Sequence, residues 1–279
     1  MPELPEVETV CRGLEASLKN AIITKAEVHR SDLRIPFPKN LAERLRARRI
    51  RGITRRAKYI LIELDKNETL LLHLGMSGRM TISKTKSKPG KHDHLVFHFN
   101  NGLHVSFNDP RRFGMCDLVP TDKLDQHKLV KHLGVEPLCD DLTTDYLAAK
   151  FKGKKTSIKI AIMDQRLVVG VGNIYASEAL FHAGINPKRL AGKVKRDEIA
   201  KLVPAIRKVL KAAIKAGGSS LRDYVQSDGE LGYFQHQFSV YGKTSEKCRD
   251  CNCNTAKTGG IKQITQGGRS SFYCPIKQL

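Results

Sequence analysis

The chain has 279 residues, which is long enough for two domains with a sizeable core. Its 49 Lys and Arg residues against 28 Asp and Glu residues give a formal net charge of +21, which indicates a polyanionic partner. The sequence has no apolar run that could span a bilayer, no signal peptide and no isolated basic amphipathic helix at either end, which disfavours a membrane partner. We therefore expect a soluble, intracellular protein that binds nucleic acid.

The first predicted element is a helix. The chain opens MPELPEVETV, and from residue 4 to residue 19 the apolar side chains recur at helical spacing. A proline and acidic residues suit the first turn of a helix, where they match the fixed backbone angle and the helix dipole. This explanation accounts for Pro5 but not for Pro2, directly after the initiator methionine.

Short strand-like segments follow, separated by polar or glycine-containing turns. They read KAEVHR, KYILIEL, ETLLLHLGM, RMTISK, DHLVFHF and GLHVSFND. So many short strands before residue 120, with few helix signals between them, favour an antiparallel sandwich or barrel.

The pattern becomes helical after HLGVEPLCDD. The helical segments read TTDYLAAKF, KTSIKIAIMD, GNIYASEALFHAG and RDEIAKLVPAIRKVLKAAIKAGG. The last has its apolar residues on one stripe and a possible C-cap at Gly217 and Gly218. From Val240 the chain is short, polar and rich in cysteine, and such a segment rarely folds without a metal or a neighbour to dock on.

The seven cysteines fall into two groups. Cys11, Cys116 and Cys139 are scattered, and we expect them to be small buried apolar residues. The other four cluster near the end of the chain, at Cys248, Cys251, Cys253 and Cys274. Nothing else in the sequence argues for the oxidising compartment that scattered disulfides would need.

The opening residues have a possible chemical role. Removal of Met1 would make Pro2 a free secondary amine, and an α-amino group, with a pKa of about 7.7–8.0, is partly uncharged at neutral pH. Its attack on a sugar C1′ would give an iminium, which weakens the C2′–H bond and promotes loss of the 3′ phosphate. Glu3 could donate a proton to the opening sugar ring, and Glu6, one turn on, could support proton transfer. The alternative is that Pro2 has no chemical role.

Two turns are candidates for a wedge that separates bases. HLGMSG places Met76 at the tip of a tight turn, and NDPRRFG places Arg111 and Phe113 after an Asp-Pro turn. Apolar wedges unstack base steps, and arginine can hydrogen-bond a base that has lost its partner. Ordinary hairpins are the alternative interpretation.

Other motifs point to phosphate. The glycine-rich turn VVGVGNIYASE opens a helix, and a helix N-terminus binds phosphate well. Lys58 in RRAKYI and the lysines of KGKKTSIK can contact phosphate or simply be solvated. The two histidines of KHDH at 91–94 fit contact with solvent or phosphate better than metal binding.

Taken together, these motifs resemble the formamidopyrimidine-DNA glycosylases, also called 8-oxoguanine DNA glycosylases. The matching segments, in the family's order, are MPELPEVE, RRAKY, HLGMSG, DPRRFG, VGVGNIYASE, QSDGELGYF and the terminal VYG, CRDC and GGRSSFYC. The resemblance covers essentially the whole chain. Leu4 indicates this branch of the family rather than the endonuclease VIII branch, which typically has glycine there.

The resemblance implies an α+β multidomain fold in three parts. These are an N-terminal catalytic helix with an antiparallel β-sandwich (1–131), a helical domain with a helix-two-turn-helix motif (132–238) and a C-terminal zinc-finger-type β-hairpin (239–279). It also implies a bacterial, cytoplasmic enzyme that binds duplex DNA, and one duplex needs only a monomer.

The same resemblance implies a role for each matching residue. Pro2 would be the nucleophile, Glu3 the general acid, Glu6 its helper, Lys58 a proton donor in β-elimination, and Arg269 a phosphate ligand that assists δ-elimination. Further DNA contacts are implied at His73, Met76, His92, Arg111, Phe113, Lys154 and Asn173. Residues 220–234 match the loop that closes over the extruded base, since the glycosidic bond is not accessible in a stacked duplex.

The implied activity is bifunctional. The enzyme would remove oxidised purines, 8-oxoguanine and formamidopyrimidines, and cut the strand by β- and δ-elimination in base-excision repair. Two alternatives remain: an endonuclease VIII-like glycosylase for oxidised pyrimidines, and a DNA-binding relative that has lost the chemistry.

The zinc site is where the chain departs from the family pattern of two Cys-x-x-Cys pairs. Cys248 and Cys251 form the first pair, but the second reads Cys274-Pro-Ile-Lys277, with lysine in place of the fourth cysteine. Cys253 is a spare thiol that would need its loop to fold back. The hairpin could hold zinc by all four thiols, hold zinc by three thiolates and a water, or lack metal. We expect one structural zinc with an irregular fourth ligand.

Overall fold

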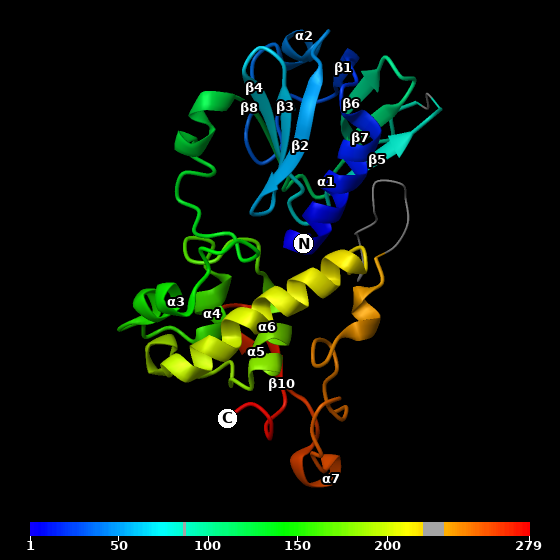
Figure 1. Ribbon diagram of the computed structural model, residues 1–279. Coiled ribbons are helices and arrows are strands. Elements are labelled where there is room, and N and C mark those ends of the chain that lie inside the picture. Colours follow the sequence, from blue (N-terminus) through cyan, green and yellow to red (C-terminus); the bar gives the residue numbers. More distant parts are fainter. Residues whose placement is uncertain (86–87, 220–231) are drawn as a thin grey trace. The chain divides into compact units, whose positions relative to one another are not determined.

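The computed structural model describes residues 1–85, 88–219 and 232–279. The chain forms two compact units (Figure 1). The first unit comprises Met1–His132 and Ala216–Gln235, and the second comprises Leu133–Lys215 and His236–Leu279.

The first unit begins with helix α1 (Leu4–Leu18), as the apolar spacing predicts. Its buried stripe includes Val7, Val10 and Leu14, and the helix packs against strand β2 (Ile50–Arg56). A capping box stabilises the N-terminus of the helix. The Glu3 side chain accepts a hydrogen bond from the backbone N–H of Glu6, and the Glu6 side chain accepts one from the backbone N–H of Glu3. This cap fixes the direction in which the first three residues leave the helix.

Two four-stranded antiparallel sheets complete this unit, in the orders β1-β6-β7-β5 and β2-β3-β4-β8. The remaining strands are β1 (Ile23–Val28), β3 (Tyr59–Leu64), β4 (Glu68–His73), β5 (Arg79–Ser83), β6 (Asp93–Phe99), β7 (His104–Asn108) and β8 (Met115–Pro120); two short helical segments are α2 (Leu41–Leu45) and η1 (Thr121–Gln126). Residues from α1 and both sheets share one hydrophobic core, including Leu14, Leu72 and Phe107. The predicted antiparallel sandwich is therefore confirmed.

The second unit is mainly helical, as expected. Its helices are α3 (Thr144–Phe151), α4 (Ile158–Met163), α5 (Asn173–Ala183), α6 (Arg196–Lys215) and α7 (Thr255–Thr258), with short 3₁₀ turns η2 (Ala191–Lys193) and, at the border of the two units, η3 (Phe234–Gln237). Helix α5 packs against both α6 and strand β10 (Arg269–Tyr273), which pairs with β9 (Lys262–Gln266) in a hairpin. Gly217, with a φ of +73°, follows the end of α6 and confirms the expected glycine cap.

The cysteine-rich end shares a small core with α5, in agreement with the expectation that it needs a neighbour to dock on. Val240, Ile261 and Phe272 are buried together with Phe181 of α5 and three of the cysteines. The segment therefore folds on the side of α5 rather than standing alone.

The three scattered cysteines differ from one another. Cys11 and Cys116 are buried, as expected, and burial raises the pKa of the Cys11 thiol to about 12. The prediction for Cys139 is wrong, because its side chain is exposed in the segment between the last strand of the sandwich and α3. Within residues 1–85, 88–219 and 232–279, no helix combines the length and hydrophobicity that a membrane span requires.

Candidate active site and nucleic-acid interface

The N-terminus presents Pro2 beside two buried carboxylic acids. Met1 is exposed, whereas Pro2 is buried and Glu3 and Glu6 retain only 3% and 2% of their accessible surface. The backbone N–H of Glu3 donates to Oε2 of Glu6 at 2.8 Å. Buried acids are rare unless hydrogen-bonded, and here the capping box holds both beside the first residues of the chain.

A segment distant in sequence also holds Glu6. Oε1 of Glu6 accepts hydrogen bonds from the backbone N–H of Ser219 at 2.9 Å and from its hydroxyl at 3.1 Å. Both residues belong to the first unit. Ser219 immediately precedes residues 220–231, so the part of the predicted base-closing loop that begins there lies outside the described residues.

Lys58 lies in the tight turn between β2 and β3, where Ala57 adopts a left-handed φ of +55°. The Lys58 side chain is buried, with 7% of its surface exposed, which argues against the solvated-edge interpretation. Arg55, near the end of β2, donates to Glu8 of α1 at 3.0 Å and to the carbonyl of Ala57 in the turn at 2.9 Å. These contacts fix the turn against α1.

His73 at the end of β4 is held as a neutral imidazole. Burial, together with the nearby cations Lys58 and Arg34, lowers the pKa of His73 to about 4. The backbone N–H of Gly75 donates to Nδ1 at 2.9 Å, so the proton of the neutral ring is assigned to Nε2. His73 can therefore offer phosphate a neutral N–H donor.

The two predicted wedge turns are joined by Asp109, which is fully buried. Its carboxylate accepts from the hydroxyl of Ser77 at 2.6 Å and from the backbone N–H of Gly114 at 2.7 Å. A Cβ at Gly75 would lie 2.4 Å from the backbone of Phe113, so the two turns are in direct contact only because glycine stands there. The sequence shows Asp109 only as a turn residue, because its bond to Ser77 spans 32 positions.

The wedge side chains themselves are exposed. Met76 retains 37% and Phe113 41% of their surface, and the Arg111 guanidinium lies 5.2 Å from the centre of the Phe113 ring. Large apolar side chains exposed on two adjoining turns form a feature that a binding partner would cover.

The histidines of KHDH do not act as a pair. His92 is partly exposed and can face a ligand, whereas His94 is buried and its Nε2 lies 2.8 Å from the carbonyl of Asp109. The expectation of solvent or phosphate contact is therefore wrong for His94, which supports the wedge turn instead.

In the second unit, Lys159 organises the predicted phosphate site. This lysine of α4 is fully buried, and its Nζ donates to Asn173 Oδ1 at 2.6 Å, to the carbonyl of Ser270 at 2.8 Å and to the hydroxyl of Ser271 at 2.7 Å. Asn173 begins α5, and the two serines follow Arg269 on β10. Lys159 thus joins two predicted DNA-contacting elements that are about one hundred residues apart in sequence.

The remaining predicted contacts of this unit lie at turns. Arg269 is exposed beside the Gly267-Gly268 turn of the hairpin. Lys154 is partly exposed in the turn before α4, and its carbonyl accepts from the backbone N–H of Gly192 at 3.1 Å. Both side chains are accessible to an anion.

Glu178 is another organising residue that sequence reasoning missed. It is buried on α5 and accepts the backbone N–H groups of Ser239, Val240 and Tyr241 at 2.8–2.9 Å. A carboxylate that accepts several backbone donors fixes the path of that backbone. Here it positions the start of the cysteine-rich segment on the helix that begins with Asn173.

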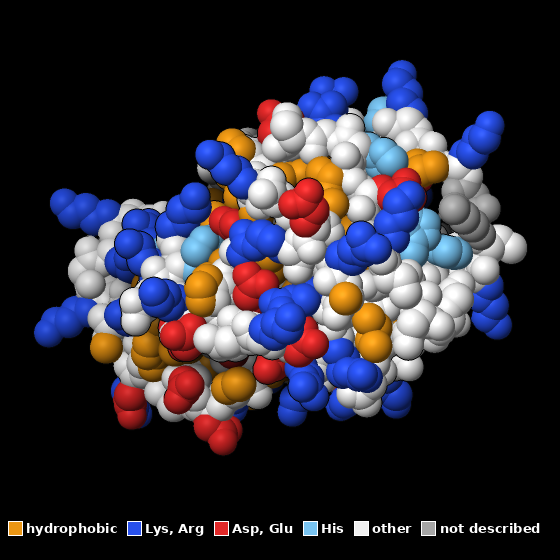
Figure 2. Space-filling model, turned by 90° about the horizontal axis from the view of Figure 1, so that it is seen from above, with side chains coloured by type: hydrophobic (Ala, Val, Ile, Leu, Met, Phe, Trp, Pro, Cys, Tyr) orange, Lys and Arg blue, Asp and Glu red, His pale blue; other side chains and the backbone are white. Residues whose placement is uncertain are grey.

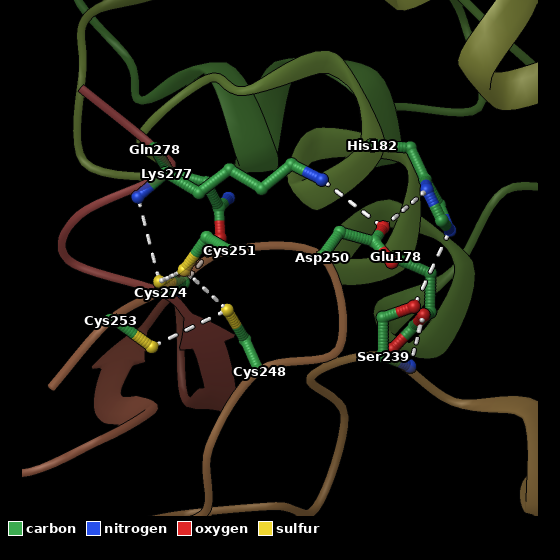
Figure 3. A network of polar contacts seen from close by, with 10 residues as sticks. All are labelled: Glu178, His182, Ser239, Cys248, Asp250, Cys251, Cys253, Cys274, Lys277 and Gln278. Atoms are coloured by element: carbon green, nitrogen blue, oxygen red, sulfur yellow. Dashed lines mark hydrogen bonds and ion pairs between the residues drawn. The ribbon is translucent and has the colours of Figure 1, made fainter. Parts of the chain in front are cut away.

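The four clustered cysteines converge, and Cys253 is among them (Figure 3). The sulfurs of Cys248, Cys251, Cys253 and Cys274 all lie within 4.8 Å of one another. Cys253 Sγ lies 3.6 Å from Cys248 Sγ, so its loop does fold back as the fourth-ligand hypothesis requires. A tetrahedral Zn²⁺ with sulfur at about 2.3 Å needs sulfurs about 3.8 Å apart. Four thiols are a donor set that such an ion prefers, and binding would move Cys248 Sγ and Cys251 Sγ apart from their present 2.7 Å.

Thiol chemistry also favours metal binding at this cluster. The pKa of Cys253 is lowered to about 7, chiefly by a hydrogen bond from the backbone of Cys248, whereas burial raises the pKa of Cys248 and Cys251. Four thiols this close cannot all ionise without a compensating charge, and a divalent cation supplies one. Lys277 does not point toward the sulfurs; its Nζ lies 3.1 Å from Asp250.

The surface agrees with a polyanionic partner. On the face drawn in Figure 2, Lys and Arg side chains are spread widely and acidic side chains are fewer. This distribution reflects the net charge of +21.

Two family models match the chain. The formamidopyrimidine-DNA glycosylase N-terminal domain matches residues 1–116, and the formamidopyrimidine-DNA glycosylase H2TH domain matches residues 133–225. The chain is 55% identical to a formamidopyrimidine-DNA glycosylase of a Ruegeria species (strain TM1040), with 98% of each chain covered. It is 50% identical to one from Rhodospirillum centenum over the whole length of both chains.

Solved structures of Lactococcus lactis proteins show the same fold. One is a variant glycosylase bound to DNA that contains Fapy-dG, with a TM-score of 0.90, 34% identity and 99% of each chain covered. Another is the complex of the Lactococcus lactis protein with DNA containing an abasic site, with a TM-score of 0.88, 35% identity and the same coverage.

Proposed function

The chain belongs to the formamidopyrimidine-DNA glycosylase family, and from this premise we propose that it excises oxidised purines from duplex DNA with Pro2 as its nucleophile. The observation that carries the proposal is the buried start of the chain, where Pro2 lies beside Glu3 and Glu6 in a fixed capping box.

The chemistry begins after removal of Met1. The Pro2 nitrogen attacks C1′ of the damaged nucleotide, the bond from C1′ to the base breaks, and the departing base takes up the proton that the Pro2 nitrogen loses. Glu3 then donates a proton to the ring oxygen as the sugar opens. The resulting iminium draws electrons from C2′, which loses a proton while the 3′ phosphate leaves. Loss of the 5′ phosphate by δ-elimination follows, and water then frees Pro2, leaving a one-nucleotide gap with phosphates at both ends.

Other residues would bind the DNA backbone, extrude the damaged base and assist the eliminations. His73, His92, Lys154, Asn173 and Arg269 would contact phosphates, with Lys58 donating a proton during β-elimination and Arg269 assisting the second elimination. Met76, Arg111 and Phe113 would occupy the space that the extruded base leaves. Of the three parts, residues 1–131 would supply the nucleophile Pro2. Residues 132–238 would supply the phosphate contacts Lys154 and Asn173, and the hairpin in 239–279 would supply Arg269. The curated relatives come from bacteria, so we place the enzyme in the bacterial cytoplasm, acting as a monomer.

We also propose that the hairpin holds one structural Zn²⁺ through Cys248, Cys251, Cys253 and Cys274. When bound, the ion would neutralise the thiolates and tie the cysteine loop to the end of β10. The fit of the four sulfurs supports this set over three thiolates and a water.

Parallel assays on two duplexes test the substrate class. We expect excision and strand cleavage with 8-oxoguanine opposite cytosine, and much slower reaction with thymine glycol opposite adenine. Electrophoresis of the cut strand should show phosphate at both ends of the gap. Faster reaction on thymine glycol would favour the endonuclease VIII-like alternative, and no cleavage of either duplex would favour the non-catalytic one.

A further inference from the structure

The cysteine cluster is asymmetric. Three of its thiols, those of Cys248, Cys251 and Cys253, come from one short loop, and only Cys274 comes from the end of β10. In the family pattern each Cys-x-x-Cys pair supplies two ligands. Here a bound ion would hold the C-terminal segment through a single bond, so another contact is needed to fix that segment.

Lys277 makes such a contact (Figure 3). Its Nζ lies 3.1 Å from Oδ2 of Asp250, a residue between two of the loop cysteines. The same ammonium lies 4.2 Å from the centre of the Phe181 ring, which is fully buried on α5. The Lys277 side chain is 23% exposed and that of Asp250 is 47% exposed, so the ion pair alone contributes little. The contact of the ammonium with the aromatic face adds to it.

The backbone that carries Lys277 is fixed from the other side. Gln278 is fully buried: its Oε1 accepts the backbone N–H of Cys274 at 2.8 Å, and its Nε2 donates to the carbonyl of Ile185 at 2.9 Å. The backbone N–H of Lys277 also points to the Cys274 sulfur, at 3.5 Å. Pairing with Asp250 therefore has to order the lysine side chain but not the backbone that carries it.

Asp250 has a second neighbour on α5, the imidazole of His182, whose pKa is held below its usual value chiefly by burial. Nδ1 of His182 lies 3.9 Å from the same carboxylate oxygen that Lys277 contacts. Asp250 is thus the point where the cysteine loop, the C-terminal turn and α5 come together, all within the second unit.

We propose that Lys277 is a positioning residue that replaces the missing metal–sulfur bond with a salt bridge and a ring contact. It ties the C-terminal turn to the cysteine loop through Asp250 and to α5 through Phe181. The tie keeps β10, and with it Arg269, in place whether or not metal is bound. The proposal rests on the proposed four-thiolate site for its role, but its contacts do not need the ion.

Amide hydrogen exchange in the hairpin tests the proposal. We would compare the wild-type chain with Lys277→Met, Asp250→Asn, the double variant and Lys257→Met, before and after treatment with a metal chelator. Lys257 is an exposed lysine of α7, and its ammonium forms no ion pair with any described residue, so it controls for the lost charge.

After chelation, the amides of Arg269–Tyr273 should exchange about tenfold faster in Lys277→Met than in the wild type. Asp250→Asn should give a smaller increase, and the double variant should match Lys277→Met because the two changes break one pair. Lys277→Arg, which keeps the charge and the ring contact, should restore slow exchange. Wild-type exchange rates in Lys277→Met, or an equal increase in Lys257→Met, would overturn the proposal.

Metal content separates this proposal from the previous one. If the purified wild-type chain contains no zinc, the four-thiolate proposal fails, while the exchange rates still decide the role of Lys277. If zinc is present, Lys277→Met should release it to a chromogenic chelator about tenfold faster than Lys257→Met does. Equal release rates in these two variants would contradict the proposal.

Discussion

His73 shows how a single residue's environment decides the kind of contact it can make. A histidine near phosphate is often assumed to act as a cation, but the buried ring beside Lys58 and Arg34 resists a further positive charge. The bond from Gly75 leaves the Nε2 proton for a ligand. We infer that His73 orients a phosphate through one directional hydrogen bond from its Nε2–H group. The positive charge that attracts the phosphate would come from the arginines and lysines.

A histidine titration followed by NMR tests this inference. We expect a pKa of about 4 for His73, and a higher value, still below 6.5, in Lys58→Met, because burial remains when the cation is gone. The neutral ring favours the fold, so this contribution to stability is complete above pH 6.5 and is lost as the pH falls toward 4. A value near 6.5 in the wild type would contradict the neutral-donor role.

Cys253 and Lys277 together make a direct test of the fourth ligand. Cys253→Ser should lower bound zinc well below one per chain, because one thiolate is lost. Adding Lys277→Cys to that variant restores the family pattern, and we expect zinc to return to near one per chain. The exposed Cys139→Ser should leave the zinc content unchanged. A full zinc content in Cys253→Ser would show that Cys253 is not a ligand.

At the scale of elements, buried polar side chains join segments that the sequence separates. Lys159 connects α4, the start of α5 and β10, and Glu178 connects α5 to residues 239–241. Each anchors an element that carries a predicted DNA contact, so the rigidity of the predicted phosphate site depends on them.

Lys159→Met tests that dependence. The variant keeps the length of the side chain but leaves the oxygens of Asn173, Ser270 and Ser271 without their donor, and we expect a loss of about 2 kcal/mol of unfolding free energy. DNA affinity should fall more than in Lys201→Met, which removes the same charge from an exposed position on α6. Denaturant unfolding and binding titrations measure both effects, and equal losses in the two variants would contradict the organising role.

The outcome for the elements shows what local sequence can reveal. The strands and helices with clear apolar periodicity were predicted, but β2 and β8 were not. In β2, Gly52 and several arginines hide the pattern, and a bulge between Ile50 and Gly52 breaks the alternation. The candidate site residues within short motifs could be named from the sequence, and their roles stay predictions.

Contacts between segments that are distant in the sequence could not be predicted from it. Lys159 and Glu178 look like ordinary helix residues in the sequence. The hydrogen-bond partners of Lys159 lie 14 to 112 positions away, and those of Glu178 lie 61 to 63 positions away. Asp109 read as a turn for the same reason. The convergence of Cys253 with the other thiols depends on how its loop folds, which spacing alone does not determine.

At the scale of the whole molecule, the net charge of +21 governs how the protein meets DNA. Each phosphate contact releases counterions, so the affinity should fall steeply with salt, linearly in the logarithms of both quantities. Lys154→Ala should weaken binding to damaged and undamaged duplexes alike. It should also reduce the steepness of the plot of log affinity against log salt concentration by about one. Titrations at several salt concentrations measure this, and an unchanged slope would remove Lys154 from the phosphate contacts.

Arg111→Ala should behave differently. Its guanidinium lies over the Phe113 ring on the predicted wedge, and we expect it to read the base opposite the lesion. We expect reduced discrimination among the four opposite bases, with a smaller effect on undamaged DNA. A uniform loss of affinity across all opposite bases would make Arg111 a phosphate contact instead.

The central claim is that the secondary amine of Pro2 forms the covalent bond to DNA. Borohydride reduction during reaction with a duplex containing 8-oxoguanine opposite cytosine, followed by mass spectrometry of the peptides, tests it most directly. We expect the reduced adduct on the N-terminal peptide that begins with Pro2, and none when a residue is added before Pro2, although that variant still binds the duplex. An adduct on Lys58, or on any other lysine, would contradict the claim.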